Sequence, residues 1–112
     1  MSENGYAFTR QSMVILPSST ATATGGAFVP RNAPIFFTAT EAGTGAVTAT
    51  VIIEASNDPT VTTSWLTLGT ITLSGTTTAQ DGFSYAGKPA NVRARLSAIS
   101  GTGAAVIVTM AT

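Results

Sequence analysis

Acidic side chains are the first candidates for acid–base chemistry in this sequence, because the chain contains neither histidine nor cysteine. Two carboxylates could cleave a glycosidic bond if one acted as the acid and the other as the base or nucleophile. Asp58 and Asp81 are the best placed for such a pair, since both lie in expected loops. Both also occupy turn sequences, in which an aspartate bonds to its own backbone. We therefore interpret both residues as turn formers.

Nucleophilic and metal-assisted chemistry have still less support. Lys88 could activate a serine only if it were buried, but it lies between Gly87 and Pro89 in an expected exposed turn. Transition metals bind chiefly to histidine and cysteine, which the chain lacks. Asn57 and Asp58 could hold calcium with loop carbonyls, although the sequence has no acidic ligands spaced as in an EF-hand. We expect no enzymatic activity, no metal and no cofactor.

Trp65, the single tryptophan, is a candidate binding residue. On a sugar-binding module it could be a stacking platform, helped by Tyr6 or Tyr85. It could equally be a core or interface anchor, because it begins an expected strand with Ile71 and Leu73 at positions of the same parity. The pattern favours core or interface packing.

Four arginines are candidate interface residues. Arg93 and Arg95 alternate with apolar residues, so both point to the same outward face of an expected strand. They are either solvated, with Glu54 as a cross-strand partner, or polar anchors for another protein, since arginine is enriched at interfaces. Arg10 and Arg31, in the N-terminal segment, have the same two interpretations.

Charge is scarce in this chain. Charged residues make up 9% of the sequence and the formal net charge is zero, whereas about a quarter of the residues in an ordinary soluble domain are charged. A free monomer with so little charge is poorly protected against association, which indicates an assembly component. The sequence has no basic stripe that could bind nucleic acid and no apolar run long enough to span a membrane. We therefore expect neither nucleic acid nor a membrane as a partner. The first residues also lack the pattern of a secretory signal.

Alternating apolar and polar residues predict an all-β fold. Three rows define inward faces: Val47 to Ala55, Val92 to Ala98 and Val106 to Met110, each read at every second residue. Further strands are expected over 35–41, 65–73 and 83–85, while 74–82 reads as a polar loop. Gly-Thr-Gly-Ala sequences at 43–46 and 101–104 mark hairpin turns. We predict a β-sandwich of jelly-roll type.

The first third of the chain differs in character. A strand is plausible over Met13–Leu16, and a low-complexity stretch of small polar residues follows over 17–26. Pro30 and Pro34 favour extended, edge-type backbone. We divide the chain into an N-terminal arm with peripheral strands (1–31) and a β-sandwich domain (32–112), with the compact part over 35–110.

Several segments carry a family resemblance. They are Glu54 to Asp58, Trp65 to Thr76, Asp81 to Phe83, Val92 to Ala94, and Ala98 to Ala104 with the valine-rich strand after it. These stretches resemble small virion proteins of tailed bacteriophages. Ser-Asn-Asp turns followed by a tryptophan strand are also similar to discoidin-like sugar-binding jelly rolls. The chain departs from the pattern at Pro59, where residues 60–64 lengthen the loop before Trp65.

The resemblance implies a capsid decoration (cement) protein, made in the host cytoplasm and bound on the exterior of the virion. Such proteins are commonly β-sandwiches, often homotrimers, placed where major capsid protein subunits meet. The implied partners are therefore the major capsid protein and further copies of this chain. The alternatives are another virion component (neck, tail or fibre attachment) and a sugar-binding module for host-surface recognition. The N-terminal arm could add a strand to a neighbouring sheet edge.

Overall fold

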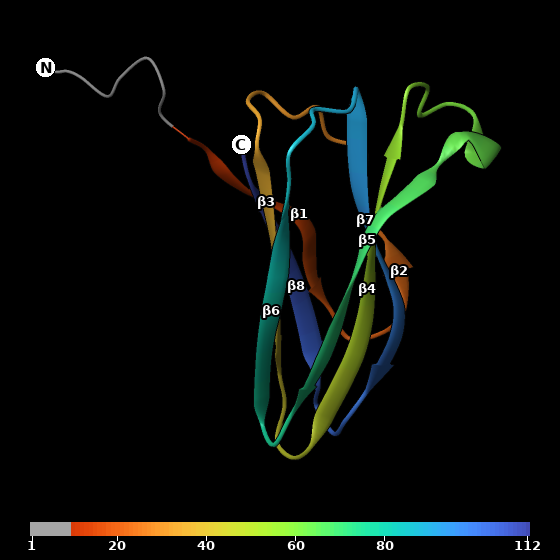
Figure 1. Ribbon diagram of the computed structural model, residues 1–112. Helices are drawn as coiled ribbons and strands as arrows, with labels where there is room; N and C mark the ends of the chain where they lie inside the picture. The colour runs from red at the N-terminus through yellow and green to blue at the C-terminus, as the bar shows by residue number, and fades with distance from the viewer. Residues whose placement is uncertain (1–9) are drawn as a thin grey trace, which may run out of the picture.

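The computed structural model describes residues 10–112, whose strands form two four-stranded antiparallel sheets packed face to face (Figure 1). The first sheet has the order β1-β8-β3-β6, with β1 Ser12–Ser19, β8 Ala105–Ala111, β3 Ile35–Ala42 and β6 Thr78–Tyr85. The second sheet has the order β2-β7-β4-β5, with β2 Ala23–Thr24, β7 Asn91–Ser100, β4 Val47–Ser56 and β5 Leu66–Gly75. Two sheets of these strand orders form a jelly roll, so the predicted fold class is confirmed.

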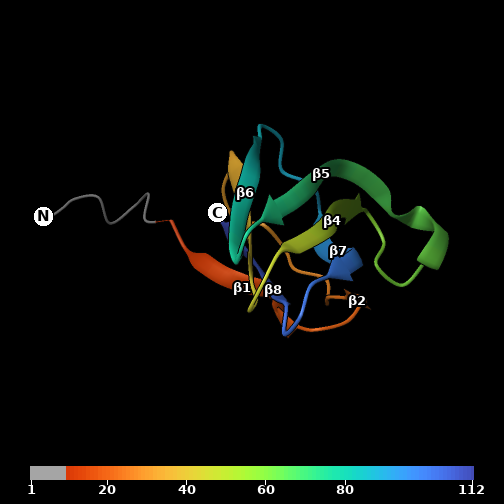
Figure 2. The same cartoon turned by 90° about the horizontal axis from the view of Figure 1, so that it is seen from below.

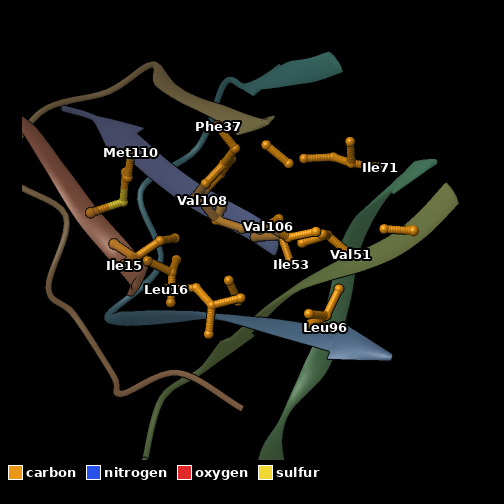
Figure 3. Packing of buried hydrophobic residues seen from close by; sticks show 14 of the residues in the cluster. Ile15, Leu16, Phe37, Val51, Ile53, Ile71, Leu96, Val106, Val108 and Met110 are labelled. Carbon is orange, nitrogen blue, oxygen red and sulfur yellow. The ribbon is translucent and has the colours of Figure 1, made fainter. Parts of the chain in front are cut away.

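The core lies between the sheets and consists of the alternate residues that the sequence pattern marks as inward (Figure 3). Phe37, Val108 and Met110 from the first sheet pack toward Val51, Ile53 and Leu96 from the second, and all six are at most 1% exposed. β-branched and aliphatic side chains suit both inner faces, because they fill the space between pleated sheets. Burial of these rows fixes the register of each strand.

Two β-bulges in the second sheet change which residues face inward. The pairing of β4 with β7 shifts between Thr50 and Val51, so Thr50 lies opposite Ala98 while Val51 lies opposite Leu96. The extra residue, Ser97, turns Ala98 outward, where it is exposed. The expectation that Ala98 shares the inward row is therefore wrong. A second bulge, at Leu68, lies in β5 beside Ile53 and Glu54.

The expected polar loop over 74–82 is mostly strand. β5 continues to Gly75 and β6 begins at Thr78, so only Thr76 and Thr77 form the connection. β6 is an edge strand that pairs with β3 along its full length, from Thr78 opposite Ala42 to Tyr85 opposite Ile35. Backbone hydrogen bonds to β3 hold this strand, and its outward side chains need no apolar character because they face water. The expected short strand at 83–85 is the end of a longer one.

The described part of the N-terminal segment belongs to the two sheets. β1 forms one edge of the first sheet and β2 one edge of the second (Figure 2). Ile15 and Leu16 of β1 are 1% and 2% exposed and lie in the core, which therefore extends beyond the expected compact part over 35–110. Gln11 and Thr112 exchange two backbone hydrogen bonds of 2.8 and 2.9 Å, so both ends of the described chain meet at one end of this sheet. Residues 1–9, the start of the expected arm, lie outside the described residues.

Candidate interaction site

Glu54 is the centre of a polar cluster on the outer face of the second sheet. It stands opposite Arg93 in the pairing of β4 with β7. Arg93 Nε donates to Glu54 Oε1 at 2.8 Å, and Arg95 Nε donates to Oε2 at 3.4 Å. Glu54 is 7% exposed, so this carboxylate is buried by its two partners and its neighbours. The cross-strand pairing with Glu54, one of the two interpretations of these arginines, is present in the structure.

Trp65 joins this cluster by packing on Arg93. The Arg93 guanidinium carbon lies 4.1 Å from the centre of the tryptophan ring, which is a cation–π geometry. The bulge at Leu68 explains this placement. Because of the extra residue, Thr67 pairs with Glu54 on the outer face while Gly69 pairs with Ile53 on the inner face. Trp65 thus follows the outward parity, is half-buried and does not share the inward row of Ile71 and Leu73.

Arg95 lies on the solvent-exposed side of the cluster. Its side chain is 38% exposed, against 22% for Arg93. Its guanidinium meets Glu54 through Nε alone, and it lies opposite Thr24 of β2. A shallow hollow of about 350 Å³ adjoins it, lined by Thr22, Ala23, Thr24, Arg95, Leu96 and Ser97. With two arginines around one carboxylate, the cluster carries an excess of one positive charge on this side.

Arg10 and Arg31 are placed elsewhere. The Arg10 guanidinium donates to the carbonyls of Pro34 and, at 3.2 Å, Ala33. The Arg31 backbone N–H donates to Thr112 Oγ1 at 2.9 Å, and the Arg31 carbonyl accepts a long bond from Lys88 Nζ at 3.5 Å. No hydrogen bond or ion pair within residues 10–112 joins either arginine to the Glu54 cluster. The structure thus brings Trp65, Arg93 and Arg95 together and leaves Arg10 and Arg31 apart.

Asp58 and Asp81 each accept hydrogen bonds from residues close to them in the chain. Asp58 Oδ1 accepts from the N–H of Thr60 at 3.0 Å and from its hydroxyl at 2.6 Å, and these bonds lower the Asp58 pKa. Asp81 lies in β6 rather than in a loop, and its Oδ1 accepts from Gly82 N–H at 2.8 Å. Within residues 10–112, no group of three or more His, Cys, Asp or Glu side chains is arranged to hold a metal ion. No helix of this part of the chain is long and apolar enough to cross a membrane.

Glu41 is a buried ionisable residue that the sequence reasoning missed. It is 0% exposed, and neither carboxylate oxygen has a hydrogen-bond partner among the described residues. Burial in this apolar setting raises the Glu41 pKa. The parity of β3 carries the signal that would have found it, because Ile35, Phe37 and Ala39 precede Glu41 on the same inward row.

Comparisons with known proteins give a fold likeness. No family model and no curated protein sequence matches the chain. The crystal structure of the SPBc2 prophage-derived protein YomS matches with a TM-score of 0.55 and 14% sequence identity, over 92% of each chain. At this level of identity the likeness concerns the arrangement of strands alone. The chain therefore shares the β-sandwich fold of a prophage-derived protein over nearly its whole length.

Proposed function

We propose that this protein is a structural component of a tailed-phage virion that docks through the Glu54 cluster. The observation that carries the proposal is the gathering of Trp65, Arg93 and Arg95 around one buried carboxylate. Tryptophan and arginine are the residue types that most often dominate binding energy at protein interfaces. The other outward residues of this sheet are uncharged, so the cluster is the single group of charged side chains on this face within the described residues.

The outer face of the first sheet supports the assembly part of this proposal. The outward residues of strands β8, β3 and β6 carry no charge. They are Ala105, Ile107, Thr109, Ala111, Phe36, Thr38, Thr40, Ala42, Thr78, Gln80, Gly82 and Ser84. A water-facing antiparallel sheet usually carries charged side chains, which also discourage association. We propose that copies of this chain associate with one another. If the protein decorates the capsid, the expected assembly is a homotrimer.

The fold adds support for a phage origin. YomS, whose fold this chain shares, is a prophage-derived protein, and jelly rolls recur in viral capsid proteins as well as in lectins. A fold does not by itself determine a function, so this support remains secondary to the cluster.

The finer proposal is capsid decoration. In this role the chain bridges major capsid protein subunits on the virion exterior, and a partner carboxylate pairs with the exposed side of Arg95. The role needs no catalytic group, cofactor, nucleic acid or membrane. A neck, tail or fibre-attachment component would use the same face with fewer copies per particle.

Quantitative mass spectrometry of purified virions from the phage that encodes this chain tests the proposal. Decoration predicts a copy number comparable with that of the major capsid protein. A few copies per particle would assign the chain to the neck or tail, and absence from the particle would refute a virion role.

Variants then test the docking face. Arg95→Gln and Trp65→Ala should lower occupancy on particles, while Thr72→Ala, on the same face of β5 but opposite Thr50, should not. Equal occupancy of all three variants would exclude the Glu54 cluster as the anchor. Light scattering of the purified protein reports whether it is a trimer before it binds.

A further inference from the structure

A pocket of about 340 Å³ opens at one end of the sandwich, and its lining residues Ala55 and Leu66 directly follow Glu54 and Trp65 in the chain. Residues of both sheets and of two loops line it: Ala55, Ser56, Asn57, Asp58, Ser64, Leu66, Leu68, Tyr85 and Pro89. Its volume lies at the lower end of the range of small-molecule sites, about 300–1,000 Å³. It is large enough for one compact ligand.

One wall of the pocket is apolar and remains open to water. Leu66 is 71% exposed, whereas Leu16, Leu73 and Leu96 are at most 2% exposed. The bulge in β5 places Leu68 next to the inward Gly69, and Leu66 pairs with the inward Ala55, so both leucines face the interior side of the sheet. Tyr85, at the end of β6, adds an aromatic ring from the opposite sheet.

The opposite wall is a polar loop held in a fixed shape. Ser64 Oγ donates to the Asp58 carbonyl at 2.8 Å, and Asp58 N–H donates to Ser56 Oγ at 3.0 Å. Thr60 occupies Oδ1 of Asp58 with two bonds. These bonds leave Asp58 Oδ2 and the Asn57 side chain without a hydrogen-bond partner within residues 10–112. A wall formed before the ligand arrives lowers the entropic cost of binding.

We propose that this pocket binds a neutral saccharide through one pyranose ring. A pyranose has an apolar face of C–H groups, which fits Tyr85 and the leucines, and hydroxyls at its rim. The hydroxyls can donate to Asp58 Oδ2 and exchange hydrogen bonds with the Asn57 amide. A purely apolar occupant would desolvate that carboxylate without giving it a partner. An anionic occupant would meet the negative charge of Asp58, which stays ionised at neutral pH.

Trp65 is not part of this site. It lies on the outward parity of β5, and the Arg93 guanidinium covers one face of its ring. The sugar-stacking role, the less favoured of the two interpretations of Trp65, therefore passes to Tyr85; Tyr6, the other tyrosine considered for it, lies outside the described residues. This activity is independent of the virion role, and the pocket would give a particle-bound protein a means of contacting glycans.

Nuclear magnetic resonance of the full chain tests the proposal with methyl glycosides of glucose, galactose, mannose and N-acetylglucosamine at millimolar concentration. At least one glycoside should shift the amide signals of Asn57, Asp58, Leu66 and Tyr85 and receive saturation from the protein at its ring C–H protons. Asp58→Asn should weaken that binding by about tenfold, because it removes the charged acceptor and keeps Oδ1 for Thr60. Tyr85→Ala should weaken it by about fivefold.

Three controls make the outcome decisive. Tyr85→Phe keeps the ring and should bind within about twofold of the wild type, so weaker binding by Tyr85→Ala alone reports the loss of the ring. Asp58→Asn tests the pocket even if Tyr85→Ala does not fold. Arg95→Gln should bind as the wild type. The proposal is overturned if no glycoside shifts the pocket signals, if the shifts centre on Arg95, or if Asp58→Asn binds unchanged. Pocket shifts that grow with protein concentration in the absence of sugar would instead assign the pocket to a second copy of the chain.

Discussion

Arg93 lies between Glu54 and Trp65, with its Nε 2.8 Å from the carboxylate and its guanidinium carbon 4.1 Å from the ring centre. The contact to Glu54 connects β7 to β4, and the contact to Trp65 connects β7 to the start of β5. One side chain therefore connects three chain segments on the outer face of the second sheet.

Glu54→Gln should destabilise the fold by about 1–3 kcal/mol, because it removes a charge-assisted hydrogen bond and leaves two neighbouring arginines without a counter-charge. Urea unfolding at neutral pH measures the change. Asp81→Asn is the matched control, since Asp81 is exposed and has no ion pair within residues 10–112. Equal stability of the two variants would show that the Glu54 pairs add nothing to folding.

Stability should fall as pH rises through the titration of Glu41. Burial raises the pKa of this carboxyl above its ordinary value of 4.5, so the folded state holds the proton more tightly than the unfolded state. The unfolded state binds fewer protons between the two pKa values, and stability is therefore greatest below 4.5 and declines up to the raised pKa. Glu41→Gln should remove this decline and stabilise the protein at pH 7 by about 1 kcal/mol or more.

Urea unfolding of wild type and Glu41→Gln across pH 4 to 8 measures this effect. The other described carboxylates, on β4, β6 and the loop after β4, are unchanged in both proteins, so the difference between the two curves isolates Glu41. Parallel curves would contradict the assignment.

Gly69→Ala should destabilise the protein by about 1–3 kcal/mol through overpacking. A Cβ at this position would lie 2.6 Å from the Phe83 ring, which itself packs on Phe37 with ring centres 5.3 Å apart. Gly45→Ala is the control, because a Cβ there meets no atom within 4 Å. Thermal unfolding of both variants checks the expectation. A decrease in melting temperature that occurs only in Gly45→Ala would refute it.

Two N-terminal truncations should differ sharply. Removal of residues 1–9 keeps every core residue that the structure describes, so the melting temperature should change little. Removal of residues 1–31 deletes Ile15 and Leu16 from the core and exposes β8, and the product should fail to fold cooperatively. Circular dichroism distinguishes the cases. Within the expected N-terminal arm (1–31), β1 and β2 should therefore be required for folding, because both belong to the sheets of the sandwich.

The alternation of residue types was enough to predict the sandwich and most of its core, because burial between two sheets demands apolar residues at every second position. It failed where one inserted residue reversed the parity. The bulge at Leu68 moved Trp65 from the inward row to the outer face, and the bulge at Ser97 did the same to Ala98. Gly69, a glycine inside the expected strand 65–73, indicates a possible bulge beside Leu68, whereas the bulge at Ser97 has no clear local signal in the sequence.

Prediction of the cluster followed the same logic. The pairing of Glu54 with the two arginines could be predicted because the alternation holds there. No bulge interrupts the pairing of β4 with β7 from Ile52 opposite Arg95 to Glu54 opposite Arg93. The strand at 78–82 was missed because an edge strand is held by backbone pairing, which leaves no apolar trace in its side chains.

The pairing of Gln11 with Thr112 has a mechanical consequence. β1 and β8 are antiparallel neighbours, so their outer ends lie together at one end of the first sheet. A force that pulls these two ends apart opens the β1–β8 ladder one rung after another, as a zipper opens. A force that pulls along the strands, between the tight turns and the opposite loops, must shear many rungs at once. Attachment through the loops at the two ends of the sandwich, rather than through Gln11 and Thr112, therefore loads the strands in their stiffer direction.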